Sequence, residues 1–150
     1  MYRIMVVDDE DYILKALNRV LAARPAWEVE TYTDAATALR RARTTVFDAV
    51  ITDYRMPDMD GIEMLQQLRT MQPDTIRILL TGVIDIDTLM SAINQAGAFR
   101  FVPKPWDDDQ LLESIEEGLK FRDILVENKI LAQTVRDQRE ALRSMGYDGE

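Results

Sequence analysis

The sequence predicts an open α/β fold, in which five parallel strands form one sheet with helices on both faces. Two observations lead to this prediction. Short apolar runs of strand length alternate with amphipathic helical patterns five times along the chain. The first run, residues 4–7, is apolar at every position, as in a strand covered on both faces. Because strands that alternate with helices form parallel sheets, the pattern favours a doubly wound domain.

The first half of the chain supplies three strands and two helices. A helix follows the first strand, because Leu14, Leu17 and Leu21 recur at helical spacing, and it ends near Pro25. The other elements of this half are an edge strand with alternating apolar and polar side chains at residues 27–32, a helix at 35–43 and a buried strand at 47–52.

Two capping boxes place helices in the second half. Asp60 is followed three residues later by Glu63, so the Asp side chain can accept a hydrogen bond at the start of a helix that runs to about residue 71. Asp107 and Gln110 repeat this pattern at the last helix. Between these helices we expect a strand at residues 76–80, a helix at 87–95 that ends at Gly97, and a strand at 99–102.

The composition narrows the possible chemistry. The 150 residues include 18 Lys and Arg against 27 Asp and Glu, for a formal net charge of −9, and no His or Cys. Disulfides, thiol catalysis, catalytic triads, zincin sites and phosphohistidine carriers are therefore excluded. The acidic balance argues against direct nucleic-acid binding by this chain, since phosphate binding needs a cationic surface.

No apolar stretch approaches the roughly 20 residues that cross a bilayer. The apolar start of the chain is too short for a signal peptide, and acidic residues follow it at once. We therefore expect a soluble, cytoplasmic protein with one main domain and no membrane partner.

Polar side chains stand at the carboxyl ends of four predicted strands. They are Asp8 and Asp9 after the first strand, Asp53 after the third, Thr81 after the fourth and Lys104 after the fifth. Ligands of open α/β sheets bind at this edge. In the flavodoxin-like strand order 2-1-3-4-5, the first and third strands are neighbours, so we expect the three acids to converge with Thr81 and Lys104 beside them.

Three carboxylates in one pocket repel one another unless a cation lies among them. Mg²⁺ suits such a site, since it takes one or two carboxylates together with waters and a phosphate oxygen. A carboxylate there can also attack phosphorus and form an aspartyl phosphate, with Lys104 and Thr81 binding the phosphoryl oxygens. Each residue alone has a simpler explanation. Asp9 or Asp11, for example, could simply be the N-cap of the first helix.

Four motifs, in this order along residues 1–120, resemble the receiver domain of two-component response regulators of the CheY-like superfamily. They are Asp8-Asp9-Glu10, the run DYRMPDMDG from Asp53 to Gly61, Thr81-Gly82 and Lys104-Pro105. The resemblance implies that Asp53 accepts a phosphoryl group from a phosphohistidine on a sensor histidine kinase or phosphotransfer protein.

The same resemblance implies a role for each site residue. Asp9, Asp53 and the main-chain carbonyl of Arg55 would bind Mg²⁺ directly, and Asp8 would act mainly through a water. Lys104 would contact the phosphoryl group, with a cis bond to Pro105. The small Gly82 would leave room for that group.

The family's switch pairs Thr81 with an aromatic residue three positions before Lys104, here Phe101. Phe has no hydroxyl where Tyr is common, so a switch must work by burial of the ring. The alternative is that Phe101 is a core residue and nothing more.

Two other functions stay open: a degenerate receiver that serves as a docking or dimerisation scaffold, and a metal-dependent phosphatase of the haloacid-dehalogenase type. That phosphatase needs an acid two residues after the nucleophile, where this chain has Arg55. We therefore expect a signalling switch and not an enzyme.

The last predicted helix continues beyond the globular body with a heptad pattern. Six of its eight core positions are apolar, which predicts that it pairs with a second copy as a coiled coil. Asn128 in this core would fix the register and favour a dimer. The alternative is that the apolar residues fold back on their own domain. Positions a are Phe121, Asn128, Val135 and Leu142, and positions d are Ile124, Leu131, Gln138 and Met145.

The expected organisation is therefore a receiver domain over residues 1–120 and an extended coiled-coil helix over 119–145. Residues 121–145 would form a homodimer, and residues 146–150 a flexible tail. We expect an output domain beyond Glu150. Residues 99–108 resemble receivers joined to cyclic-dinucleotide phosphodiesterases or to NtrC-type activators, and the choice between these outputs stays open.

Overall fold

A five-stranded parallel sheet in the order β2-β1-β3-β4-β5 forms the centre of the molecule, which confirms the expected fold class. The computed structural model describes residues 1–82 and 86–146, so residues 147–150 of the expected tail lie outside the described residues. The strands are β1 (Tyr2–Val7), β2 (Trp27–Tyr32), β3 (Ala49–Asp53), β4 (Ile76–Thr81) and β5 (Arg100–Pro103). The helices are α1 (Asp11–Leu21), α2 (Ala35–Ala42), α3 (Gly61–Met71), α4 (Ile86–Ser91), the π-helix η1 (Ala92–Ala96) and α5 (Asp108–Ser144).

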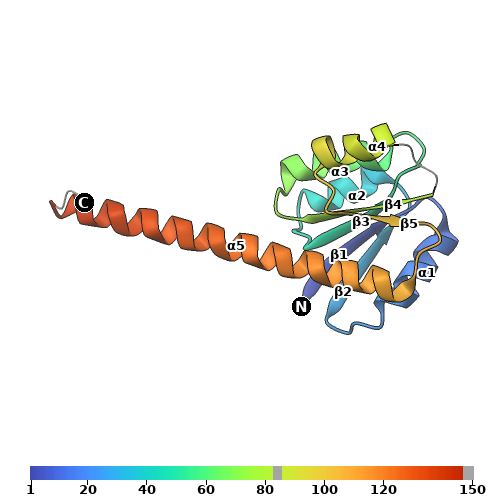
Figure 1. Cartoon of the computed structure of the whole chain (residues 1–150), viewed down its shortest axis with the longest axis horizontal. Helices are drawn as coiled ribbons and strands as arrows, with labels where there is room; N and C mark the ends of the chain where they lie inside the picture. Colours follow the sequence, from blue (N-terminus) through green and yellow to red (C-terminus); the bar gives the residue numbers. More distant parts are fainter. Residues whose placement is uncertain (83–85, 147–150) are drawn as a thin grey trace.

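Helices cover both faces of the sheet, and each face has its own apolar core (Figure 1). Side chains of α1 and α5 pack on one face, against Ile4, Ile51 and Ile78 among others. Side chains of α2, α3 and η1 pack on the other face, where Met5 and Leu79 are fully buried. Successive residues of a strand point to opposite faces, so a strand covered on both sides must be apolar throughout.

The capping predictions are confirmed where they concern the Asp side chains. Asp60 Oδ1 accepts a hydrogen bond from the Glu63 N–H at 2.9 Å, and Asp107 Oδ1 accepts one from the Gln110 N–H at 3.0 Å. Gly97 ends the helical segment before β5 with a φ of 62°. The last turn of that segment differs from the prediction, because residues 92–96 are wound as a π-helix.

Two boundaries also differ from the sequence prediction. β3 begins at Ala49 and not at residue 47, because the Phe47 N–H donates to Gln72 Oε1 at 2.9 Å. It ends one residue later than expected, so Asp53 belongs to the strand. Neither Asp9 nor Asp11 caps α1, since the N-cap position is occupied by Glu10 without a side-chain hydrogen bond.

The long helix α5 packs on the sheet with its first third and then leaves the body (Figure 1). Its buried residues end at Leu119, and all described residues from 127 onward are exposed. The heptad residues from 128 onward therefore do not fold back on their own domain, whereas the Phe121 ring packs against Phe99, with ring centroids 5.6 Å apart. Among the residues that the structure describes, no helix is both long and apolar enough to cross a membrane.

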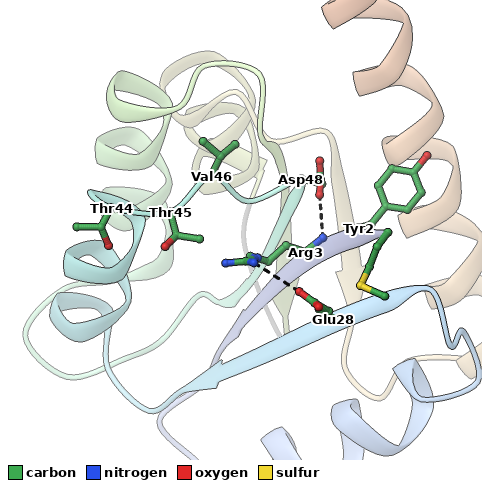
Figure 2. Close-up of a pocket in the computed structure, with 8 residues that line it drawn as sticks. Tyr2, Arg3, Glu28, Thr44, Thr45, Val46 and Asp48 are labelled. Carbon is green, nitrogen blue, oxygen red and sulfur yellow. Dashed lines mark hydrogen bonds and ion pairs between the residues drawn. The ribbon is translucent and has the colours of Figure 1, made fainter.

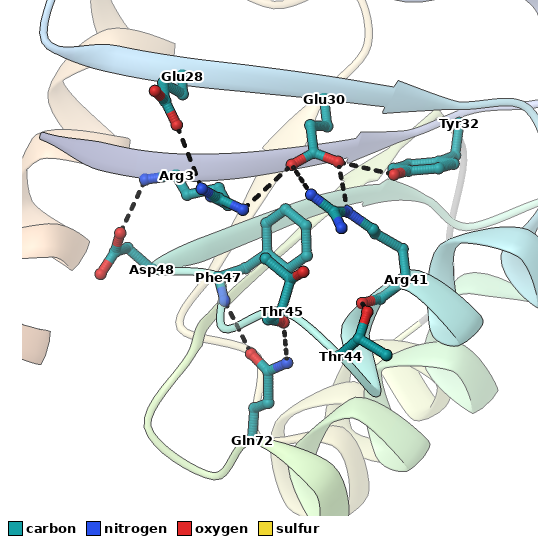
Figure 3. A network of polar contacts seen from close by, with 10 residues as sticks. All are labelled: Arg3, Glu28, Glu30, Tyr32, Arg41, Thr44, Thr45, Phe47, Asp48 and Gln72. Atoms are coloured by element: carbon teal, nitrogen blue, oxygen red, sulfur yellow. Dashed lines mark hydrogen bonds and ion pairs between the residues drawn. The ribbon is translucent and has the colours of Figure 1, made fainter.

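A polar network covers the β2 edge of the sheet (Figure 3). Glu30 accepts hydrogen bonds from Arg41 at 2.9 and 3.3 Å and from the Tyr32 hydroxyl at 2.8 Å. The Arg3 guanidinium lies 3.8 Å from the same carboxylate. These bonds, first of all the one from Arg41, hold the pKa of Glu30 below its usual value. Paired charges on an edge strand also oppose pairing with another chain.

Glu30→Gln should therefore destabilise the protein in a pH-dependent way. A carboxyl whose pKa falls on folding adds stability above its ordinary pKa of 4.5, and this gain is lost as the pH falls through the lowered value. We expect a loss of about 1 kcal/mol in the free energy of unfolding at pH 7, with the difference from wild type shrinking toward pH 3. Urea denaturation at several pH values measures this difference.

Glu28→Gln is the matched control for this variant. The Glu28 side chain is 53% exposed and its ion pair with Arg3 spans 3.5 Å, so its loss should change the free energy of unfolding by less than about 0.5 kcal/mol. Equal losses in the two variants, or a Glu30→Gln effect that does not vary with pH, would contradict this account of the edge network.

Candidate functional site

The sheet brings three acidic side chains together at the carboxyl ends of β1 and β3. Val7 of β1 pairs with Thr52 of β3, so the next residues, Asp8 and Asp53, lie side by side. Asp8, Asp9 and Asp53 each place a carboxylate oxygen within 4.8 Å of the others. Asp8 is fully buried and Asp53 is 8% exposed, whereas Asp9 is exposed. The convergence expected from the strand order is therefore present.

Lys104 reaches into this acidic cluster from the end of β5. Its Nζ lies 3.0 Å from Asp8 Oδ2 and 2.9 Å from Asp53 Oδ1. Its main-chain N–H donates to the Thr81 carbonyl at 2.8 Å, which holds the β4 and β5 ends together. The peptide bond from Lys104 to Pro105 is cis, as the resemblance implied.

The surroundings of the cluster raise the pKa values of both Lys104 and Asp53. Burial raises the pKa of the Asp53 carboxyl and the nearby Asp8 adds to the increase, while hydrogen bonding to Lys104 opposes it. Burial would lower the pKa of Lys104, but hydrogen bonds to Asp53 and Asp8 raise it above its ordinary value. Lys104 thus supplies a counter-charge within hydrogen-bonding distance of both buried carboxylates.

The donor set fits a hard divalent cation. Three ionised carboxylates and one ammonium leave two negative charges, and all the candidate ligand atoms are oxygens, which Mg²⁺ prefers. Asp8, Asp9 and Asp53 each offer one carboxylate oxygen, and these three atoms lie within 4.8 Å of one another. Arg55, the fourth predicted ligand through its carbonyl, is exposed in the loop after β3.

Thr81 and Phe101 lie on the same face of the sheet, next to the cluster. Thr81 ends β4 and is 5% exposed. Phe101 pairs with Leu79, two residues before Thr81, so all three side chains point to the face covered by α3 and η1. Phe101 is half-buried against the core on that face, as are Tyr54 and Met56. The predicted switch pair therefore lies on one face of the sheet.

The loop between β3 and α3 is tightly folded against the cluster. Asp58 has a φ of 69°, a left-handed conformation that costs a non-glycine residue roughly 1–2 kcal/mol. The Gly61 N–H donates to the Tyr54 carbonyl at 2.8 Å. A Cβ at Gly61 would lie 2.2 Å from the main-chain oxygen of Asp53, so only glycine fits there. Sequence reasoning treated Gly61 as part of a motif and missed this close approach.

Sequence reasoning also did not place Tyr12 and Trp106 beside the cluster. An open groove of about 460 Å³ adjoins Lys104 and is lined by Glu10, Tyr12, Ile13, Pro105 and Trp106 as well. Tyr12 is 68% exposed there.

A separate groove of about 610 Å³ lies at the opposite edge of the sheet, near the starts of β1 and β2 (Figure 2). It contains none of the predicted site residues.

Comparisons with known proteins agree with this geometry. The model of the response regulator receiver domain matches residues 4–116. The hydrogenase transcriptional regulatory protein HoxA of Bradyrhizobium diazoefficiens is 33% identical over 117 residues, which are 78% of this chain and 24% of that protein. The signal receiver domain of an HD domain-containing protein from Pseudomonas fluorescens Pf-5 is 34% identical, with a TM-score of 0.78 and coverage of 81% of this chain and 97% of that one.

A CheY-like response regulator receiver domain protein from Methanospirillum hungatei is also similar. It is 30% identical, has a TM-score of 0.77, and the match covers 82% of this chain and 97% of that one. The chain spans about a quarter of the length of the curated relatives it matches, such as HoxA at 24% and the regulatory protein AtoC of Escherichia coli at 28%.

Fold and site together define a doubly wound α/β domain with a cluster of three carboxylates at the carboxyl edge of its sheet. The chain belongs to the response regulator receiver domain family. Receiver domains are signalling domains that generally bind Mg²⁺ at such a cluster, and those of NtrC-like regulators work with histidine kinases and output domains.

The two glycines near the site should respond differently to an added methyl group. Gly61→Ala should lower the free energy of unfolding by about 1–3 kcal/mol, because its Cβ would collide with the Asp53 backbone. Gly82→Ala should change it by less than about 0.5 kcal/mol, since a Cβ there would meet nothing within 4 Å. Urea denaturation measures both values. Equal stability of Gly61→Ala and wild type would show that the loop does not need this contact.

Proposed function

We propose that the chain is a phosphoacceptor receiver whose Asp53 takes a phosphoryl group from a phosphohistidine on a sensor histidine kinase or phosphotransfer protein. The observation that carries this proposal is the position of the nearly buried Asp53 carboxylate, 2.9 Å from Lys104 Nζ and within 4.8 Å of the Asp8 and Asp9 oxygens. Asp8, Asp9, Asp53 and the Arg55 carbonyl would hold Mg²⁺. The protein acts as a switch, and its only chemistry is its own phosphorylation and slow dephosphorylation.

The transfer needs a carboxylate that is both ionised and aimed at the donor. An Asp53 oxygen attacks phosphorus, the P–O bond forms as the P–N bond to imidazole breaks, and the leaving nitrogen keeps the electron pair. Lys104 neutralises the phosphoryl oxygens, and the Thr81 hydroxyl donates a hydrogen bond to one of them. Bound Mg²⁺ would supply further charge neutralisation at the same oxygens. Catalysis is then mostly positioning and electrostatics.

Phosphorylation is then relayed through Thr81 and Phe101. A phosphoryl group adds negative charge and strong acceptors at Asp53, which draws the Thr81 hydroxyl inward. The Phe101 ring, half-buried on the same face, then moves into the volume that Thr81 leaves. The response reaches α4, whose residues 86–91 bury no side chain, whereas Ala92 and Ala96 in η1 are fully buried. The loosely packed end of this segment can move at low cost.

Asp53→Asn should abolish phosphorylation by a small acyl phosphate in the presence of Mg²⁺. The wild type should gain one phosphoryl group that is stable in acid and labile in alkali, and removal of Mg²⁺ with a chelator should prevent it. Intact-protein mass spectrometry measures the uptake. Asp58→Asn is the control, since Asp58 is an exposed acid of the neighbouring loop and should react as the wild type does. Continued stoichiometric uptake by Asp53→Asn would refute the acceptor assignment.

We also propose that α5 joins two copies of the chain. In this proposal, residues 1–120 are the receiver domain, residues 119–145 a coiled-coil linker, and residues 121–145 the dimer contact. Six apolar heptad residues are 40–69% exposed on α5, which is unfavourable for a helix in water. They are Phe121, Ile124, Leu131, Val135, Leu142 and Met145. An output domain beyond Glu150 fits the greater length of the relatives.

Leu131→Arg should turn the dimer into a monomer. A charged side chain in the core of the helix pair would be buried without a partner, which costs several kcal/mol. Gln133→Arg is the control, because Gln133 lies on the outer face of the same turn and is exposed. Sedimentation equilibrium should report a dimer for the wild type and for Gln133→Arg. A wild-type chain that stays monomeric at high micromolar concentration would contradict the dimer.

A further inference from the structure

Two arginine side chains converge on the turn between η1 and β5. Gly97 in this turn has a φ of 62°, and a Cβ there would lie 2.9 Å from Arg77 Nη2 and 3.4 Å from Arg69 Nε. Because both distances start from one point, the two nitrogens are at most about 6.3 Å apart, close enough for both to donate to a single tetrahedral anion. We call Arg69 and Arg77 the arginine pair.

The arginine pair has no acidic partner. Neither guanidinium forms an ion pair with a carboxylate among the residues that the structure describes. Arg77 donates from Nε and Nη1 to three main-chain carbonyls at 2.9–3.2 Å, and Arg69 donates from Nη1 to one at 3.3 Å. These bonds hold each cation at the turn but use neither Arg77 Nη2 nor Arg69 Nε, and they leave two positive charges side by side.

This arrangement is unfavourable until an anion joins it. Burial lowers the pKa of the half-buried Arg77, and the positive charge of Arg69 lowers it further. The carboxylate of Asp74 opposes this decrease, but it is itself paired with Lys129. An anion between the two guanidiniums would remove their repulsion and accept charge-assisted hydrogen bonds from both.

A groove of about 310 Å³ opens beside Arg77, between the starts of β4 and β5 and the helix α5. Its apolar wall includes Phe99, Phe121 and Leu125. Phe121 is 45% exposed although its ring packs on that of Phe99, so one side of the aromatic pair faces the solvent. A groove with apolar walls and charged donors at one end has the composition typical of a small-molecule site.

We infer that this groove binds a phosphomonoester with a small aromatic or apolar remainder. The phosphate lies at the arginine pair, and the remainder packs on Phe121 and Leu125. The two negative charges of a phosphomonoester match the two guanidiniums, whereas a single carboxylate would leave one of them unbalanced. The inference is independent of the phosphoacceptor role proposed above, because the groove lies at the start of β4, roughly 17 Å along that strand from Thr81.

A ligand in this groove contacts the body and α5 at once. Phe121 and Leu125 belong to the stretch of α5 just after Leu119, the last buried residue of the helix. A bound molecule therefore adds contacts where those between helix and body become sparse. The site would couple the concentration of a phosphorylated small molecule to how firmly α5 is held on the body.

Titration of the full ¹⁵N-labelled chain with phenyl phosphate tests the site. A chelator is present throughout, so that no divalent cation can draw phosphate to the acidic cluster. We expect saturable shifts of the amide resonances of Arg77, Gly97 and Ala98. Inorganic phosphate lacks the ring and benzoate lacks the second charge, so each should bind about tenfold more weakly.

Three results of this titration would overturn the inference. The first is a response that does not saturate by about 50 mM phenyl phosphate, which is weaker than the binding expected of two charge-assisted contacts. The second is a set of shifts confined to Asp53, Thr81 and Lys104, which would place the ligand at the other edge of the sheet. The third is equal binding of benzoate, which would exclude a site built for a phosphate.

Substitutions of the arginine pair separate a built site from general attraction to positive charge. Arg69→Gln should weaken phenyl phosphate binding about tenfold, and the fold should persist because this exposed side chain makes one main-chain bond. Arg77→Lys keeps the charge but loses the planar guanidinium, and it should weaken binding about fivefold. Circular dichroism checks that each variant is folded, and Arg69→Gln decides the matter if Arg77→Lys is not.

Arg100→Gln is the matched control. It also removes one positive charge near the start of β5, but Arg100 is exposed, pairs with Glu117 and lies over the Phe99 ring outside the arginine pair. We expect this variant to bind phenyl phosphate within about twofold of the wild type. Equal weakening by Arg100→Gln and Arg69→Gln would show that the ligand responds only to net charge, and the inference would fall.

Discussion

The ammonium group of Lys104 between Asp8 and Asp53 is the interaction on which the rest of the structure depends. Both carboxylates are nearly or fully buried, and burial of ionised carboxylates is costly unless a cation lies within hydrogen-bonding distance. Lys104 meets both at 2.9–3.0 Å. Because these three residues stand at the carboxyl ends of β1, β3 and β5, the cluster exists only when β1, β3, β4 and β5 are paired in this order. The same contacts that neutralise the acids therefore depend on the pairing of these four strands.

The acidic cluster also explains why such a site can serve as a switch. One ammonium cannot neutralise three carboxylates, so the cluster retains negative charge that a divalent cation can balance. In the proposed function, a phosphoryl group on Asp53 would change this balance and compete for Lys104, Thr81 and the metal. The change would occur at strand ends that are held together by main-chain bonds, such as the Lys104 N–H to the Thr81 carbonyl at 2.8 Å. We therefore expect a local change in charge to reach the elements that share the β4–β5 edge.

Much of the fold and of the cluster could be predicted from the sequence, because both depend on local patterns. Apolar runs locate the strands, Asp60 and Asp107 locate helix starts, and parallel strand order brings Asp8 and Asp53 to one edge. The features that the sequence did not predict depend on close approach in three dimensions. The backbone of Gly61 lies against the Asp53 carbonyl, and the groove beside Lys104 is lined by Tyr12 and Trp106, which are distant in the chain. Helical periodicity, likewise, does not reveal the π-helical turn of η1, because it depends on tertiary packing.

The extended helix α5 raises the question of how a change at one edge of the sheet could reach a partner at the other. α5 starts just after Lys104 and Pro105, beside the acidic cluster, and leaves at the opposite edge. A helix of 37 residues is about 55 Å long and stiff on this scale. Apolar packing alone would let its exposed part swing, since the last buried residue is Leu119. The ion pairs of Arg122 with Asp48 and of Lys129 with Asp74 extend the contact with the body past that point. We therefore expect a displacement beside the cluster to move the distal helix together with the body rather than to be absorbed by bending at the boundary.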